Sequence, residues 1–318
     1  MRIVKLVVMA LAALVLAAVG FVYIAPEKAT HFAITLERQR AGLVRKQIEL
    51  PGGLRYVYLE GGQGEPLLLL HGFGADKDNF VRAARFLTPH FHVIVPDQIG
   101  FGESAHPLQA DYAPIAQSKR LRALMQALGI KNIHLGGSSM GGHIALTYAA
   151  LYPEEVQSLW LLDSAGVWTA PESELQKIIR QTGHNPLMAR NEDEFAATFA
   201  FVMNDPPFIP RPMLNVLARE RIRNFALEER IFSQLKADSI EQRIRGLSTP
   251  TLIVWGEKDR GINVATANIL HTLLPNSQLI LMRGIGHLPM IERPQQSAED
   301  YLRFRASLQA RVASDEVR

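Results

Sequence analysis

Residues 137–141 read Gly-Ser-Ser-Met-Gly and fit the pattern G-x-S-x-G only with Ser139 at the centre. A serine hydroxyl becomes a good nucleophile when a neighbouring base accepts its proton. The apolar segment 132–135 precedes this serine and a helical pattern over 140–151 follows it, which is the strand–turn–helix context of a nucleophile elbow. Glycine permits the sharp turn that such an elbow needs. The pattern therefore predicts a nucleophilic serine at position 139.

The base and the acid that support such a serine are expected later in the chain, in the order serine, acid, histidine. Asp259 follows the apolar segment 251–255, and His287 follows the apolar segment 278–282. Both would lie at carboxyl ends of strands, where open α/β sheets place their sites. We expect His287 to take the proton of Ser139 and Asp259 to orient the imidazole.

Two backbone amides are candidates for binding the oxyanion that forms during acyl transfer. One is the N–H of Met140, directly after the nucleophile, and the other is the N–H of Phe73, in the loop after the apolar segment 66–70. His71 begins this loop. We interpret it as a structural residue that holds the loop, because it lacks the placement of the predicted base.

Other residues leave alternatives open or exclude other chemistry. Asp163, at the end of the apolar segment 159–162, is a second candidate for the acid. The glycine-rich segment 96–104 lacks the Gly-Lys-Ser/Thr ending of a phosphate-binding loop. Because no H-E-x-x-H or comparable ligand spacing occurs, we expect neither a metal nor a cofactor.

The composition is that of an ordinary folded protein. The chain has 318 residues, of which 47% are hydrophobic and 20% charged, enough for one large domain with an appendage. The net charge is +3 without a long Lys/Arg block, so we expect no nucleic-acid partner. The chain has no cysteine, which excludes disulfides and thiol catalysis.

Beyond the N-terminal region, short apolar runs alternate with helical patterns, which is typical of a mostly parallel sheet covered on both faces. This alternation predicts an α/β core over residues 47–167 and 247–313. Residues 168–246 contain helical patterns without a strand-like run, and we expect them to form a helical cap or lid. Their apolar stretches are expected to pack the cap onto the sheet, to line an acyl-chain pocket, or both.

The first 26 residues form a separate region. Residues 6–25 carry no charged side chain, and as a helix they would span ~30 Å, the thickness of a bilayer core. A cleaved signal peptide is the alternative, although the apolar run continues past the possible cleavage site. We expect residues 1–26 to be a transmembrane anchor and residues 27–46 to be a juxtamembrane helix.

Small residues recur on one face of the predicted anchor at steps of three and four: Ala10, Ala13, Ala17 and Gly20. Such a stripe allows two transmembrane helices to approach closely, so a homodimer through this helix is a further prediction. Basic residues lie on both sides of the anchor, and the positive-inside rule therefore does not decide its orientation.

Together, these motifs make residues 47–311 resemble the α/β-hydrolase superfamily, above all membrane-anchored monoacylglycerol lipases and bacterial phospholipases A. The motifs occur in the expected order: Leu70-His-Gly-Phe-Gly74, Asp97-Gln-Ile-Gly-Phe-Gly102, Gly137-Ser-Ser-Met-Gly141, Trp255-Gly-Glu-Lys-Asp259 and Gly286-His287. The resemblance implies the α/β-hydrolase fold and hydrolysis of acyl esters of glycerolipids or glycerophospholipids. It also implies Ser139, Asp259 and His287 as the triad.

For such relatives, the resemblance further implies a single-pass protein of the bacterial inner membrane with its catalytic domain in the periplasm. A neighbouring branch with the same Ser-Met-Gly-Gly elbow cleaves carbon–carbon bonds. A tethered esterase or C–C bond hydrolase for small soluble substrates is therefore the alternative function, and a catalytically silent scaffold is a third. Ser139 excludes dehalogenases and epoxide hydrolases, which need a carboxylate at the elbow.

Overall fold

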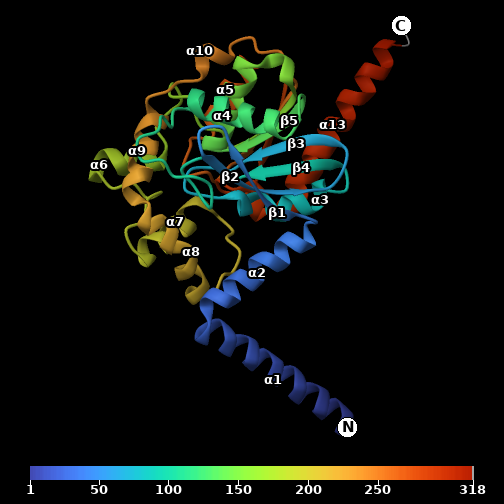
Figure 1. Ribbon diagram of the computed structural model, residues 1–318, viewed down its shortest axis with the longest axis vertical. Coiled ribbons are helices and arrows are strands. Elements are labelled where there is room, and N and C mark those ends of the chain that lie inside the picture. Colours follow the sequence, from blue (N-terminus) through green and yellow to red (C-terminus); the bar gives the residue numbers. More distant parts are fainter. Residues whose placement is uncertain (317–318) are drawn as a thin grey trace.

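The computed structural model describes the backbone of residues 1–316 and the side chains of residues 1–310. Its centre is an eight-stranded sheet with the strand order β1-β2-β4-β3-β5-β6-β7-β8 (Figure 1). β2 runs antiparallel to β1 and β4, and the strands from β4 to β8 are parallel. The strands are β1 (Val44–Leu50), β2 (Leu54–Gly61), β3 (Glu65–Leu70), β4 (Phe91–Pro96), β5 (Ile133–Ser138), β6 (Val156–Leu162), β7 (Thr251–Gly256) and β8 (Ser277–Met282).

Helices cover both faces of this sheet, which explains why its central strands are continuous apolar runs. In β3, Leu68 and Leu70 point into a core formed with α4 (Pro114–Ala127), α5 (Met140–Leu151) and α11 (Ala265–Leu273). The alternate residues of the same strand, Leu67 and Leu69, pack into a second core with α3 (Val81–Leu87) and α13 (Pro294–Glu316). A strand buried on both faces needs apolar side chains at every position. The predicted α/β fold is confirmed.

The chain between β6 and β7 contains helices and, within the described residues, no strand. We call residues 168–246 the helical insertion. It lies at one end of the sheet, beside α2 (Pro26–Arg40) (Figure 1). Its helices are α6 (Glu174–Thr182), α7 (Glu192–Val202), α8 (Arg211–Arg223), α9 (Phe225–Lys236) and α10 (Glu241–Ile244). The remaining short helices are η1 (Lys77–Phe80), η2 (Pro153–Glu155) and α12 (Pro289–Glu292).

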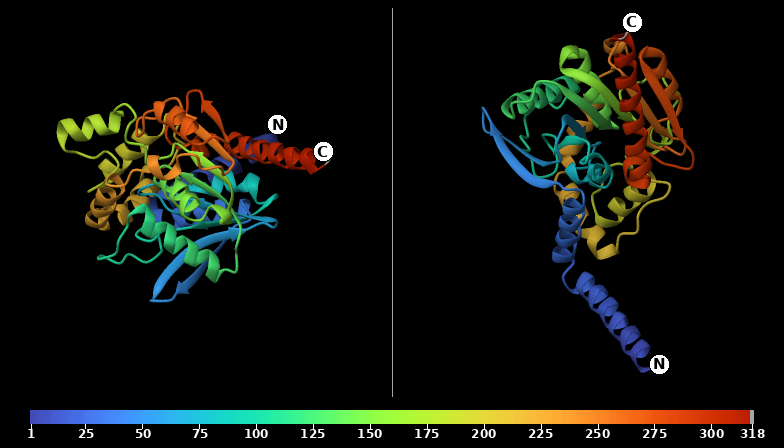
Figure 2. Two further views of the ribbon diagram at one scale, coloured as in Figure 1. Left: turned by 90° about the horizontal axis from the view of Figure 1, so that it is seen from above. Right: turned by 90° about the vertical axis from the view of Figure 1, so that its right-hand side faces the viewer.

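The N-terminal helix α1 (Arg2–Ile24) projects away from the rest of the molecule, with none of its residues buried (Figure 2). It is long and apolar enough to cross a membrane, a property it shares with signal sequences. α2 follows after a break at Ala25 and Pro26 and packs beside α8. A bidentate ion pair between Arg38 and Asp78 (2.6 and 2.5 Å) fastens α2 to the loop after β3.

The predicted juxtamembrane helix over residues 27–46 is wrong at its C-terminal end. α2 ends at Arg40, and Val44 already begins the edge strand β1. Gly42 between them has a φ of +65°, in the left-handed region that ends many helices. The sequence of β1 mixes charged and apolar residues because its side chains are mostly exposed at the sheet edge. That mixture also fits a surface helix.

Candidate active site

Ser139 lies in the turn between β5 and α5 with φ 55° and ψ −118°, a conformation that L-residues rarely adopt. Its N–H donates to the carbonyl of Leu162 (3.0 Å), and its own carbonyl accepts the N–H of Ala165 (3.0 Å). These bonds to the end of β6 hold the strained turn in place. The strand–turn–helix arrangement predicted around Ser139 is therefore present.

The glycines around Ser139 are required by close backbone approach. A Cβ atom at position 137 would overlap the carbonyl oxygen of Gly141, in the first turn of α5. A Cβ atom at position 141 would overlap the carbonyl oxygens of Leu70 and His71 at the end of β3. The glycines thus bring α5 and the loop after β3 together at the serine.

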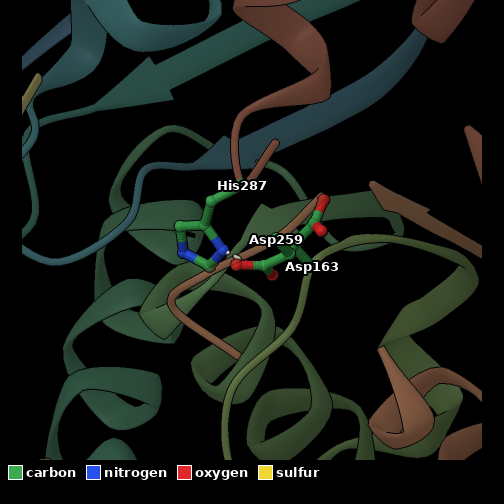
Figure 3. A group of neighbouring side chains, drawn as sticks. All are labelled: Asp163, Asp259 and His287. Atoms are coloured by element: carbon green, nitrogen blue, oxygen red, sulfur yellow. Dashed lines mark hydrogen bonds and ion pairs between the residues drawn. The ribbon is translucent and has the colours of Figure 1, made fainter. Parts of the chain in front are cut away.

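His287 and Asp259 form a hydrogen-bonded pair (Figure 3). The Nδ1–H of His287 donates to Asp259 Oδ2 at 2.8 Å, and the two side chains are 6% and 0% exposed. Asp259 Oδ1 accepts the N–H groups of Gly261 (2.7 Å) and Ile262 (3.0 Å), which fix the carboxylate. With Nδ1 as donor, the lone pair on Nε2 is the one able to accept a proton.

Asp163, the alternative acid, lies beside Asp259 but forms no hydrogen bond with His287 among the described residues (Figure 3). Its Oδ1 accepts the N–H of Gly256 (2.9 Å), and its buried Oδ2 has no hydrogen-bond partner within the described residues. Burial, followed by the neighbouring Asp259, raises the pKa of Asp163 well above its ordinary value. Because the hydrogen bond of His287 goes to Asp259, the geometry favours Asp259 as the acid.

The loop after β3 runs directly against the serine. A Cβ atom at Gly72 would lie 3.2 Å from Ser139 Cβ. The His71 ring is fully buried, with Nδ1–H donating to the Gly72 carbonyl (2.8 Å) and Nε2 accepting the N–H of Gln98 (3.0 Å). Burial lowers the pKa of His71 to about 4, so it stays neutral. These bonds agree with the predicted structural role of His71.

The N–H of Phe73 belongs to the loop after β3, and that of Met140 begins α5 directly after Ser139. Within the described residues neither amide donates to a backbone or side-chain acceptor. Unpaired donors next to a nucleophile are available to a developing negative charge. Their placement is compatible with the predicted oxyanion hole.

Ser139 and His287 line one cavity of about 470 Å³, together with Phe73. The walls of the cavity are mostly apolar and come from α2, α7, α8 and the loop at 207–210, including Ile34, Phe195, Phe199, Ile209, Met213 and Leu217. The sequence led us to expect a pocket within residues 168–246, and α2 was not expected to contribute. The side chains of α2 that line the cavity belong to no sequence motif, so the sequence alone does not indicate this contribution.

Glu292 has a positional role that the sequence did not reveal. One carboxylate oxygen accepts the N–H of Gly286 (3.0 Å), next to His287, and the other accepts those of Asn204 (2.9 Å) and Asp205 (2.8 Å). The buried carboxylate therefore ties the histidine loop to the helical insertion. Its partners are backbone amides, which any residue type supplies, so no sequence signal indicates them.

Comparison with known proteins shows the family to which the chain belongs. A family model described as "alpha/beta hydrolase fold" matches residues 65–294. The chain belongs to the α/β-hydrolase family. Lipase 1 of Psychrobacter immobilis is 44% identical over 88% of this chain and 90% of the relative. Monoacylglycerol lipase ABHD6 of Mus musculus is 28% identical, over 78% of this chain and 77% of the relative.

A solved structure of a membrane phospholipase A, described as a bacterial virulence factor, has the same fold. It superimposes with a TM-score of 0.87 and 38% identity, covering 96% of this chain and 99% of the other. The resemblance inferred from the motifs is thus confirmed at the level of the family.

Proposed function

We propose that this protein is a membrane-bound serine hydrolase that cleaves acyl esters of glycerolipids or glycerophospholipids through an acyl-enzyme at Ser139. The observation that carries the proposal is that His287, hydrogen-bonded to the buried Asp259, lines one largely apolar cavity together with Ser139. Kinship with lipases and a membrane phospholipase A supports the lipid substrate.

The chemistry follows from the arrangement of donors and acceptors. His287 Nε2 accepts the proton of Ser139 as Oγ attacks the acyl carbonyl carbon, and Asp259 stabilises the imidazolium that results. The amides of Phe73 and Met140 donate to the oxyanion. The imidazolium then protonates the leaving glycerol oxygen, and a water activated by His287 hydrolyses the acyl-enzyme. No hydrogen bond joins Ser139 to His287 in the described residues, and such bonds often tighten only with substrate bound.

The cavity suggests how an acyl chain would be held. Its walls combine α2 with the helical insertion, so these segments would act as a cap over the nucleophile. Apolar walls bind an acyl chain because each Å² of apolar surface that is removed from water contributes about 25 cal/mol of favourable free energy. A small polar substrate of the alternative function would leave most of these walls uncovered.

Exposed aromatic residues near α1 support a membrane location for the domain itself. The loop before α8 descends beside α2 to the junction of α1 and α2 (Figure 1). It carries Phe208, which is 90% exposed, and Phe32 on α2 is 64% exposed. With α1 crossing the bilayer, both rings would lie at its surface, where an acyl chain could enter without crossing water.

We further propose a single-pass protein of the bacterial inner membrane, with the domain in the periplasm and α1 forming a homodimer contact. Protease added to intact spheroplasts should digest the domain, and protection would place it in the cytoplasm. Oxidative crosslinking of A13C and A17C variants in membranes should trap a dimer. Persistent monomer in both variants would contradict the dimer.

Product analysis tests the central proposal. Purified full-length protein is incubated with vesicles that contain monoacylglycerol, diacylglycerol and phospholipid, with Ser139→Ala as the matched control. We expect free fatty acid from the wild-type protein alone. Hydrolysis of short soluble esters, with none of vesicle lipid, would instead favour the tethered esterase.

A further inference from the structure

Arg221, in the last turn of α8, is the centre of a buried hydrogen-bond network that joins three segments of the chain. Its guanidinium forms a bidentate ion pair with Glu228 of α9, with bonds of 2.6 and 2.9 Å. It also donates to the carbonyl of Leu187, before α7, at 2.5 Å, and to the carbonyl of Gly74, in the loop after β3, at 2.6 Å.

This network is costly to bury and specific in its geometry. Arg221 is 9% exposed and Glu228 is 2% exposed. Burial raises the pKa of Glu228, and the charge of Arg221 acts against that rise. A buried ion pair contributes little net stability over apolar residues, whereas removing one partner is strongly destabilising. The planar fork of arginine fits one carboxylate and two carbonyls at once, which an ammonium group does not match.

The Gly74 carbonyl is the only one of these acceptors that belongs to the sheet half of the site. It follows Phe73, whose N–H is the proposed oxyanion donor, and the Phe73 ring lies 5.8 Å from the guanidinium carbon. Gly74 has a φ of +66°, and a Cβ atom there would overlap the guanidinium. On the other side of Phe73, the Gly72 carbonyl is held by His71. The Gly74 carbonyl is thus held from the helical insertion, whereas the loop is held from the sheet side at Gly72 before Phe73 and at Lys77 after it, where Asp97 accepts the Lys77 N–H.

We propose that Arg221 is a positioning residue that latches the oxyanion loop to the helical insertion, so that the Phe73 amide is correctly aimed only while the insertion is docked. The proposal rests on the proposed function. Arg221 acts through the loop and does not itself contact the reacting atoms. Glu228 and the Leu187 carbonyl hold the guanidinium in the orientation that reaches Gly74.

The test compares Arg221→Lys, Arg221→Met and Glu228→Gln with two controls on the same helices, Arg223→Met and Glu229→Gln, whose side chains are exposed. Activity on a soluble short-chain ester gives kcat and KM separately. Because a small displacement of an oxyanion donor is costly, we expect kcat to fall about 10- to 100-fold in all three variants. KM should change less than about 3-fold, and the controls should match the wild type.

A trifluoromethyl ketone supplies a readout that a merely structural role would not move. Ser139 Oγ adds to its carbonyl, the serine proton passes to His287, and the resulting hemiketal oxyanion occupies the proposed hole. Its inhibition constant should rise in proportion to the loss of kcat/KM in each variant. On a logarithmic scale, Arg221→Lys should recover less than half of the kcat that Arg221→Met loses, since lysine keeps the positive charge but lacks the planar guanidinium.

The outcomes separate this proposal from the proposed function. The proposed function is contradicted if the wild-type protein does not hydrolyse the ester, or if the Ser139→Ala variant hydrolyses it equally well. An active wild type with unchanged kcat in Arg221→Lys and Glu228→Gln overturns the latch alone. So does a fall in kcat without weaker inhibition by the ketone. If Arg221→Met does not fold, the nearly isosteric Glu228→Gln variant still tests the latch. Its melting temperature, compared with that of Glu229→Gln, shows whether it is folded.

Discussion

The two halves of the site are built differently. The sheet half presents Ser139, Asp259 and His287 after the carboxyl ends of β5, β7 and β8, and backbone hydrogen bonds fix the serine turn and the carboxylate. The helical half, made of α2 and the helical insertion, supplies mostly apolar walls. Its polar links to the sheet half include Arg221, Glu292 and the Arg38–Asp78 pair, and apolar side chains of α9 and α10 also pack into the core on one face of the sheet.

This difference indicates a division of labour. Acyl transfer needs reacting groups held within a few tenths of an ångström, and strand ends provide that rigidity. Binding a chain of variable length needs apolar area that many side chains can supply equally well. Substitutions in the sheet half should therefore act on kcat or on folding. Those of the apolar wall residues in the helical half should act on substrate choice and membrane binding, whereas those of Arg221 and Glu228 should act on kcat through the oxyanion loop.

The largest expected effect separates the two acids of the sheet half. Asp259→Asn should lower kcat about 10³- to 10⁴-fold, because an amide favours the wrong imidazole tautomer and does not stabilise the imidazolium. Asp163→Asn should cost less than about 10-fold, since the amide oxygen can still accept the N–H of Gly256 and the Asp163 side chain forms no hydrogen bond with His287 within the described residues. Steady-state kinetics on a soluble ester measure both, and the reverse ranking would make Asp163 the acid.

Gly141→Ala should destabilise the fold. Alanine in a helix normally gains about 1 kcal/mol over glycine. Here the new Cβ would overlap two carbonyl oxygens of the backbone, which cannot move aside, and a net loss of about 3 kcal/mol is expected. Urea unfolding measures the change. The control is Gly129→Ala, which meets no atom within 4 Å and whose φ of +73° should cost only about 1–2 kcal/mol. A stabilised Gly141→Ala variant would refute the close approach of α5 and β3.

The sheet half could be read from the sequence because its chemistry depends on local patterns. A strained turn demands glycines at fixed offsets around Ser139, and a strand end precedes both Asp259 and His287. The pairing of Asp259 rather than Asp163 with His287 could not be decided in this way, because both follow buried strands. Only the relative positions of β6, β7 and β8 in the sheet decide it.

The helical half was predictable as an insertion but not as a cavity wall. Helical periodicity marks an apolar face without saying which segment it meets. The contacts of Arg221 and Glu292 that cross between segments go to backbone carbonyls or amides far away in sequence, which no side-chain pairing could reveal. The edge strand β1 was missed because an exposed strand has a weak apolar pattern.

A substitution in the helical half tests its contact with the bilayer. Phe208→Ser should reduce hydrolysis of vesicle lipid about 10-fold, because burying an aromatic ring contributes roughly 1.5–3 kcal/mol. Because the loop at 207–210 also lines the cavity, hydrolysis of a soluble ester should fall less, by under about 3-fold. Leu108→Ser is the matched control, since Leu108 is 69% exposed and lies in the segment between β4 and α4, outside the helical half. Equal losses on both substrates would show that Phe208 does not act through the membrane.

The smallest effect concerns Glu220 of α8, which lines the cavity close to the sheet half. Burial, followed by the charges of Asp76 and Asp97, raises its pKa from 4.5 to about 7, although Lys77 and Arg223 act in the opposite direction. His106 Nε2 lies 3.9 Å from its carboxylate. Between these two pKa values the folded protein holds more of this proton than the unfolded chain does. Glu220 therefore costs stability progressively as the pH rises from about 4.5 to 7.

Glu220→Gln should remove that cost. We expect no difference in the free energy of unfolding at pH 4 and a gain of about 1 kcal/mol at pH 8, a value reduced for solvent screening because the side chain is 35% exposed. Urea unfolding of the full-length protein in detergent, from pH 4 to 8, measures the change. A variant that is less stable at pH 8 would show that the carboxylate is compensated by its cationic neighbours. In that case the attraction of Glu220 to the cationic groups around it would outweigh the cost of burying its carboxylate.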